Sequence, residues 1–88
     1  MVGNVIMQIF YKSEAVRRLK NLGSAEKLKA KRKIESLLLN PLVGKKLKGE
    51  FSGLRSLRAW PLRIIYIYDS KIQTITIITV DYRGDVYK

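Results

Sequence analysis

The chain contains neither cysteine nor histidine. Without cysteine it has no disulfide, no thiolate zinc site and no cysteine nucleophile. Without histidine it also lacks the commonest metal ligand of proteins and the usual general base near neutral pH. Any catalysis must therefore use tyrosine, lysine, arginine or carboxylate side chains, or groups that the substrate supplies. We expect no cofactor and no metal partner.

Acidic residues are scarce as well: 7 Asp and Glu stand against 18 Lys and Arg, which gives a net charge of +11 and a pI near 10.2. Such a field attracts polyanions and makes binding strongly dependent on salt. Nucleic acid is the first candidate partner, an acidic protein the second, and an anionic membrane a distant third. No apolar run is long enough to span a bilayer, and the first residues lack the layout of a signal peptide. We therefore expect a cytoplasmic protein without a membrane partner.

The size of the chain predicts one domain, residues 1–88, because a second domain would be too small to bury its own core. A hydrophobic share of 47% is enough for a compact fold. The apolar, β-prone run 5–11 predicts the first strand. Three further strands are predicted at 54–59, 62–69 and 72–80, the last almost wholly apolar and therefore interior.

Two helices are predicted between the first strand and the others. Ser13 is the predicted N-cap of the first helix, and Gly23 is placed to end it. Ser24 is the predicted N-cap of a second helix that reaches about Asn40, where Pro41 ends it. The buried stripe of this second helix is predicted to contain four residues: Leu28, Ile34, Leu37 and Leu38. The order β-α-α-β-β-β predicts an α+β fold, with an antiparallel helical hairpin on one face of a mainly antiparallel sheet.

Three arginines stand between apolar positions of the C-terminal third: Arg58, Arg63 and Arg83. Alternate residues of a strand point to opposite faces, so an arginine beside a buried residue lies on the open face or is paired. If the strands pair in order, these guanidinium groups converge near one end of the sheet, where they can hold a phosphate through parallel N–H bonds. The alternative is that Arg58 and Arg63 form ordinary ion pairs with carboxylates, for which there are three candidates: Asp69, Asp81 and Asp85.

Tyrosines and lysines extend the predicted cationic surface. Tyr82 and Tyr87 offer planar rings on which unstacked bases can rest, or a phenol beside a reacting hydroxyl. The glycine-rich basic loop 41–53 offers lysines to phosphates, although a solvated connection has the same composition. Tyr66 and Tyr68, inside a strand, are predicted to serve packing. The candidate RNA-binding residues are six: Lys45, Lys46, Lys48, Arg55, Arg58 and Tyr82.

Two segments carry a more specific pattern. Residues 47–66 follow the pattern L-x-G-E-x-x-G-L-R-S-L-R-A-W-P-L-R-I-I-Y, and residues 83–88 read R-G-D-V-Y-K. Together with the order of elements, these segments resemble the RelE/ParE toxin superfamily over nearly the whole chain. The resemblance implies the toxin of a type II toxin–antitoxin module, neutralised by an acidic, RelB-like antitoxin that covers the cationic face.

RelE-like members of the superfamily are ribosome-dependent endoribonucleases that cut messenger RNA. They act by attack of a ribose 2′-hydroxyl on the adjacent phosphate, which needs no metal and no nucleophile from the protein. The resemblance implies that Arg63 and Arg83 stabilise charge on the phosphate, and that Arg58 helps to hold it. It also implies that Tyr87 orients the nucleotide or takes part in proton transfer.

The chain departs from this pattern at three positions. Leu54 and Ser56 stand where strongly active relatives have lysine or glutamate, and Tyr82 stands where many relatives have histidine. The resemblance therefore implies a weakened acid–base pair and reduced activity. Two other interpretations stay open: a ParE-like inhibitor of DNA gyrase, and a non-catalytic module that binds RNA or the ribosome. The presence of both Arg83 and Tyr87 counts against the gyrase interpretation.

Overall fold

A five-stranded sheet organises the computed structural model, which describes residues 6–82. Its strands are β1 (Gln8–Tyr11), β2 (Lys45–Lys46), β3 (Arg55–Ala59), β4 (Leu62–Asp69) and β5 (Thr74–Tyr82). They lie in the order β1-β5-β4-β3-β2, and only β1 pairs in parallel, with β5. The helices are α1 (Ser13–Lys20) and α2 (Ser24–Ser36), and a short 3-10 helix covers Gly49–Phe51. The predicted α+β fold is confirmed.

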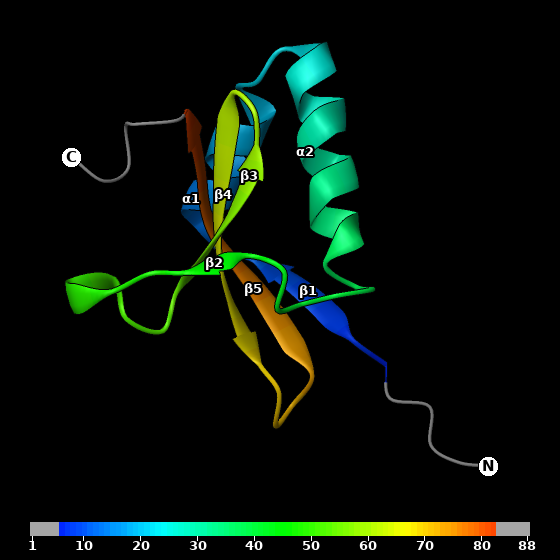
Figure 1. The fold of residues 1–88 in the computed structure, drawn as a ribbon. Helices are drawn as coiled ribbons and strands as arrows, with labels where there is room; N and C mark the ends of the chain where they lie inside the picture. Colours follow the sequence, from blue (N-terminus) through cyan, green and yellow to red (C-terminus); the bar gives the residue numbers. More distant parts are fainter. Residues whose placement is uncertain (1–5, 83–88) are drawn as a thin grey trace.

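The two helices pack on the sheet more than on each other. α1 lies against β5, whereas α2 lies against β3 and β4 (Figure 1). Side chains from the helices and the residues just after them meet the sheet in one core: Ala15, Ala30, Ile34 and Leu37, with Leu19 and Leu22 partly buried beside them. Neither described helix is long and apolar enough to cross a membrane.

Alternation along β4 separates the core from the opposite face. Leu62, Ile64 and Tyr66 are almost fully buried on the side of the helices. On β5, a bulge lies opposite the step from Ile65 to Tyr66, and it leaves Ile78 without a partner in the ladder. A bulge shifts the alternation of side chains by one residue. The core face of β5 therefore carries Ile75 and Ile77 before the bulge and Val80 after it, and all three are at most 1% exposed.

The second helix is shorter than predicted, and half of its predicted stripe is wrong. α2 ends at Ser36, four residues before Asn40. Leu28 is 48% exposed and Leu38 is 45% exposed. The buried face is instead formed by Ala30, Ile34 and Leu37, whose spacing of four and three residues keeps them on one side. Ala30 at the N-terminal end of this face is a small residue, which a pattern of large apolar residues does not reveal.

The predicted ends of several elements also need correction. Ser13 and Ser24 are the first helical residues, while Lys12 and Gly23 hold the N-cap positions without a side-chain cap. β5 begins at Thr74 rather than at residue 72, because the preceding turn is longer than predicted and Asp69 closes it by accepting a hydrogen bond from the Lys71 amide at 2.9 Å. The predicted loop 41–53 contains β2 and the 3-10 helix. The interior position of β5, between β1 and β4, is confirmed.

Candidate nucleic-acid interface

Two arginines face each other across the β3–β4 hairpin. The register pairs Arg58 with Arg63, and their neighbours Leu57 and Ile64 are core residues on the side of the helices. Both arginines therefore lie on the open face, as alternation predicted. Like charges directly opposite each other destabilise a strand pair, so this arrangement favours an anion between the two guanidinium groups.

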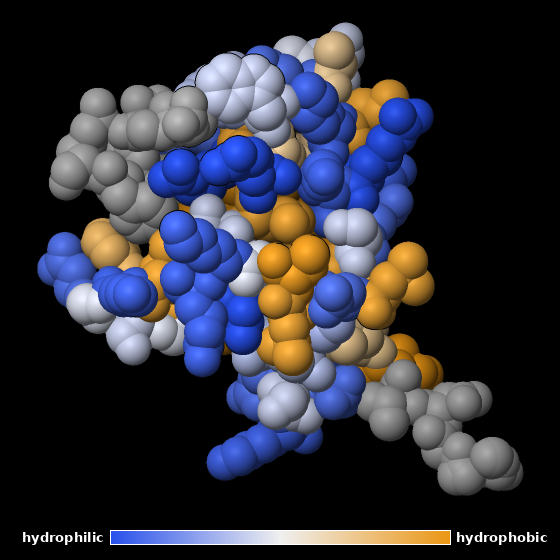
Figure 2. All heavy atoms as spheres, viewed as in Figure 1, coloured by the Kyte–Doolittle hydropathy of each residue, from blue (hydrophilic) through white to orange (hydrophobic). Residues whose placement is uncertain are grey.

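A hollow of about 210 Å³ lies at this pair. Its lining is formed by five residues: Lys45, Leu47, Ser56, Arg58 and Arg63. β2 supplies Lys45, whose backbone partner on β3 is Ser56. The structure thus brings three of the predicted cationic residues to one place, and no acidic residue of the described part of the chain lines it. Figure 2 shows hydrophilic side chains gathered over the upper part of the sheet in this view.

Arg55 lies on the opposite face from Arg58, and its charge is used locally. Its Nη1 donates hydrogen bonds to the carbonyl oxygens of Leu42 at 3.2 Å and Gly44 at 2.9 Å. Lys46, the backbone partner of Arg55, lines a separate hollow of about 310 Å³. Lys48 is exposed just before the 3-10 helix. The structure therefore does not bring these three predicted RNA-binding residues into the arginine hollow, and their role in binding RNA stays a prediction.

Tyr82 is also directed away from the hollow. It pairs with the core residue Leu62, and its hydroxyl donates a 2.7 Å hydrogen bond to Glu26 of α2. That hydrogen bond to the carboxylate raises the pKa of the Tyr82 phenol. Two of the three predicted catalytic residues, Arg83 and Tyr87, lie outside the described residues, and only Arg63 lies within them.

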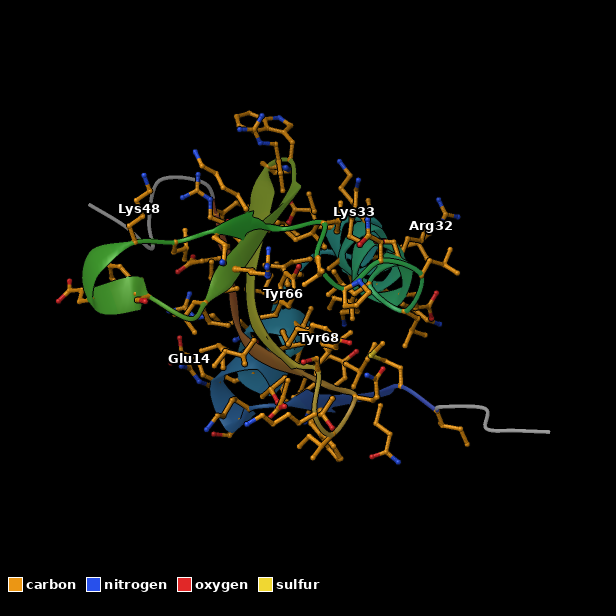
Figure 3. All side chains as sticks on the ribbon, turned by 60° about the horizontal axis from the view of Figure 1, so that its bottom comes forward. Glu14, Arg32, Lys33, Lys48, Tyr66 and Tyr68 are labelled. Carbon is orange, nitrogen blue, oxygen red and sulfur yellow. The ribbon has the colours of Figure 1, made fainter. Side chains whose placement is uncertain are left out.

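The loop that carries Lys45 is held by a buried tyrosine. The Tyr66 hydroxyl donates to the carbonyl oxygen of Pro41 at 2.8 Å and accepts from the Gly44 amide at 2.9 Å. Tyr66 points from β4 to the side of the sheet where α2 lies (Figure 3). A Cβ at Gly44 would lie 2.6 Å from this hydroxyl, so the close approach requires glycine. The predicted packing role of Tyr66 is confirmed by its burial, but no pattern in the sequence predicted that its hydroxyl also holds the loop before Lys45.

A polar network that joins α1 to the C-terminal half of β5 was not predicted from the sequence. Glu14 of α1 accepts hydrogen bonds from Arg18 at 3.2 Å and from Thr79 at 2.9 Å. Arg18 also forms a 2.9 Å ion pair with Asp81, which is the backbone partner of Arg63. The spacing of four residues between Glu14 and Arg18 was the available signal. Asp81, one of the carboxylates predicted as alternative partners of Arg58 and Arg63, thus forms an ion pair with the first helix and also lies opposite Arg63 in the sheet. Within residues 6–82, no cluster of carboxylates could hold a metal ion.

This network predicts a dependence of stability on pH. The hydrogen bond from Thr79 is the main cause that lowers the pKa of Glu14 below its ordinary value of 4.5, and Arg18 lowers it further. A group with a lowered pKa in the folded state stabilises the fold above its unfolded pKa, and this contribution is lost as the pH falls through the folded pKa. We expect the wild type to lose more stability than the Glu14→Gln variant between about pH 6 and about pH 3, measured by urea unfolding. Equal losses in both proteins would contradict the role of Glu14.

Comparisons with known proteins agree with this fold. A family model described as the ParE toxin of the type II toxin–antitoxin system parDE matches residues 9–87. The toxin RelG of Mycobacterium tuberculosis is 39% identical over 46 residues, so the match spans about half of that toxin (53%) and half of this chain (52%).

Solved structures of toxins have the same fold. A chain of the toxin–antitoxin complex RelBE2 from M. tuberculosis aligns with a TM-score of 0.81 at 29% identity, covering 88% of this chain and 98% of that one. The isolated RelE toxin of Escherichia coli aligns with a TM-score of 0.76 at 21% identity, covering 93% of this chain and 92% of that one, which shows a shared fold. The chain therefore belongs to the RelE/ParE superfamily, the toxins of type II toxin–antitoxin systems.

Proposed function

We propose that this toxin is a ribosome-dependent endoribonuclease that inhibits translation by cutting messenger RNA. The observation that supports the proposal best is the hollow in which Arg58 faces Arg63 beside Lys45. A phosphate in this hollow would receive charge-assisted hydrogen bonds from two opposed guanidinium groups. Leu47 and Ser56 complete the lining and add no negative charge that would repel it.

The proposed reaction is attack of a ribose 2′-hydroxyl on the adjacent phosphorus. The 2′-oxygen loses its proton and bonds to phosphorus, the bond to the 5′-oxygen breaks, and that oxygen takes up a proton. The products are a 2′,3′-cyclic phosphate and a free 5′-hydroxyl. Negative charge grows on the phosphate oxygens in the transition state, where fixed cationic donors stabilise it more than the starting phosphate. Arg63 and Arg58 are proposed to supply these donors, together with Arg83 from beyond the described residues.

Proton transfer is proposed to involve groups other than histidine. Lys45 lines the hollow and, as an ammonium group, can donate a proton to the leaving oxygen. Tyr87 is proposed to orient the nucleotide or to carry the other proton. Because the chain contains no histidine, the usual general base near neutral pH, we expect cleavage to be slow and to rely on how the ribosome orders the message.

The partners follow from the same chemistry. Similar solved structures include RelE–RelB complexes, such as the archaeal one from Pyrococcus horikoshii. We propose that an acidic, RelB-like antitoxin covers the cationic surface and that the ribosome and messenger RNA are the targets. The toxin would then act in the cytoplasm.

Primer extension on a translated message tests the proposal. Cuts at fixed positions within codons, present only when ribosomes and the toxin are combined, are the expected result. Cuts on naked RNA would remove the requirement for the ribosome. An intact message on ribosomes that have bound the toxin would contradict cleavage and leave a non-catalytic ribosome-binding module.

The family model provides one observation in favour of a second function. Its description names the ParE toxin, and the match covers residues 9–87. The alternative is therefore inhibition of DNA gyrase. A supercoiling assay with purified gyrase separates the two functions: loss of supercoiling together with an intact message would favour gyrase as the target.

A further inference from the structure

The turn between the two arginine-bearing strands exposes the only tryptophan of the chain. Trp60 and Pro61 connect β3 to β4, and Trp60 is 57% exposed. Tryptophan is among the more buried residues on average, so an exposed tryptophan is informative. Its large, flat ring at a protein surface is typical of binding sites.

The turn is held in place on both sides. The residues that flank it, Ala59 and Leu62, are 2% and 1% exposed and pair with each other across the hairpin. Lys29 of α2 donates a 2.6 Å hydrogen bond from Nζ to the Trp60 carbonyl oxygen. In Figure 1 the hairpin rises beside the N-terminal half of α2, which agrees with this contact. The position of the Trp60 backbone is therefore fixed relative to the sheet.

The turn is also close to the arginine pair in the chain. Arg58 is two residues before Trp60 and Arg63 is three residues after it. Two residues of extended chain span at most about 7 Å, so the backbone of Trp60 lies within about that distance of the backbone of Arg58. A phosphate held by the guanidinium groups thus leaves its base, or the next one, within reach of the indole ring.

We propose that Trp60 stacks on an unpaired base of the RNA whose phosphate binds at Arg58 and Arg63. This inference rests on the proposed function and adds a base-binding residue to it. Aromatic rings combined with cationic groups are the usual means by which proteins bind single-stranded RNA. Stacking tolerates every base, because each has a flat π-face. The cationic groups around the turn, Lys29 included, favour RNA over an apolar protein segment as the partner.

The single tryptophan makes a direct test possible. The wild-type protein is titrated with a short single-stranded RNA that carries 2′-O-methyl groups and so cannot be cut, and tryptophan fluorescence is followed. We expect quenching that saturates as the RNA binds. An oligonucleotide of the same length without bases should bind through its phosphates and leave the fluorescence unchanged.

Variants give an independent measurement by anisotropy of a labelled RNA. Trp60→Ala is expected to weaken binding by about 10-fold or more, and Trp60→Phe to restore most of it, since phenylalanine also stacks. Phe10→Ala is the matched control, because Phe10 is a similarly exposed aromatic residue (54%) on the edge strand β1. Thermal unfolding of each variant verifies that it is folded.

Several outcomes would overturn the inference. They are an absence of quenching, equal quenching by the oligonucleotide without bases, and equal RNA affinities of Trp60→Ala and Phe10→Ala.

Weakened binding of the antitoxin alone would show that Trp60 contacts protein instead. Base-dependent quenching without any cleavage on ribosomes would support the stacking and refute the endonuclease. Cleavage by a Trp60→Ala variant at the wild-type rate would refute the stacking alone.

Discussion

Replacement of Arg63 by alanine is expected to lower the rate of messenger RNA cleavage on ribosomes by about 100- to 1000-fold, the loss typical of removing one fixed donor to a developing negative charge. Arg63 lines the hollow and is only partly exposed, so its charge acts where water screens it less than at the open surface. Arg63→Lys should recover only part of the rate, because an ammonium group cannot form two parallel hydrogen bonds. The measurement is the initial rate of truncated product in primer extension.

The control must remove a positive charge elsewhere. Arg32→Ala serves this purpose, because Arg32 points from α2 into solvent, away from the sheet (Figure 3). It lowers the net charge of +11 by the same amount as Arg63→Ala. If both variants lost activity to the same extent, the effect would come from the overall charge, and the hollow would not be the catalytic site. Arg58→Ala is expected to show a smaller loss than Arg63→Ala, because Arg58 is the more exposed of the pair.

Replacement of Tyr66 by phenylalanine is expected to lower the free energy of unfolding by about 1–3 kcal/mol. The hydroxyl is fully buried and binds two backbone groups, the Pro41 carbonyl and the Gly44 amide. Its removal leaves both groups without this partner, which costs more than the loss of an exposed hydrogen bond. Urea unfolding measures the change.

Tyr68→Phe is the matched control for this prediction. It removes a hydroxyl from the same strand, but that hydroxyl is only partly buried and lies 3.5 Å from the Gln73 amide oxygen, at the limit of a hydrogen bond. We expect little change in stability. If Tyr66→Phe were as stable as Tyr68→Phe, the two hydrogen bonds would not hold the loop. A folded Tyr66→Phe protein should also cleave messenger RNA more slowly. The Tyr66 hydroxyl holds Gly44, and the next residue, Lys45, lines the hollow.

The hairpin β3–β4 shows how one small sheet buries core residues on one face and presents cationic groups on the other. Its core face carries Leu57, Ile64 and Tyr66, which hold the helices and the loop before β2. Its open face carries the arginine pair. Since successive residues alternate between the faces, the arginines cannot turn inward without moving the core residues outward. The position of the cationic groups is therefore fixed by the same register that buries the core.

Several properties of this protein are determined by the sequence alone. The absence of cysteine and histidine limits the chemistry, and the excess of lysine and arginine selects anionic partners. Hydrophobic periodicity predicted the order of the elements, because the spacing of apolar residues is a local property. Alternation within a strand was enough to predict that Arg58 and Arg63 lie on the open face.

The tertiary structure decided what the neighbours of these residues are. Register made Arg58 face Arg63. The Tyr66 hydroxyl, which donates to the Pro41 carbonyl and accepts from the Gly44 amide, brought the loop with Lys45 to the same hollow. Alternation places Arg55 on the opposite face from Arg58, but only the tertiary structure shows that it donates to the carbonyl oxygens of Leu42 and Gly44. The hydrogen bonds of Tyr66 and Arg55 join residues 11 to 25 positions apart. A local pattern of residues cannot show which distant groups will need a partner once they are buried.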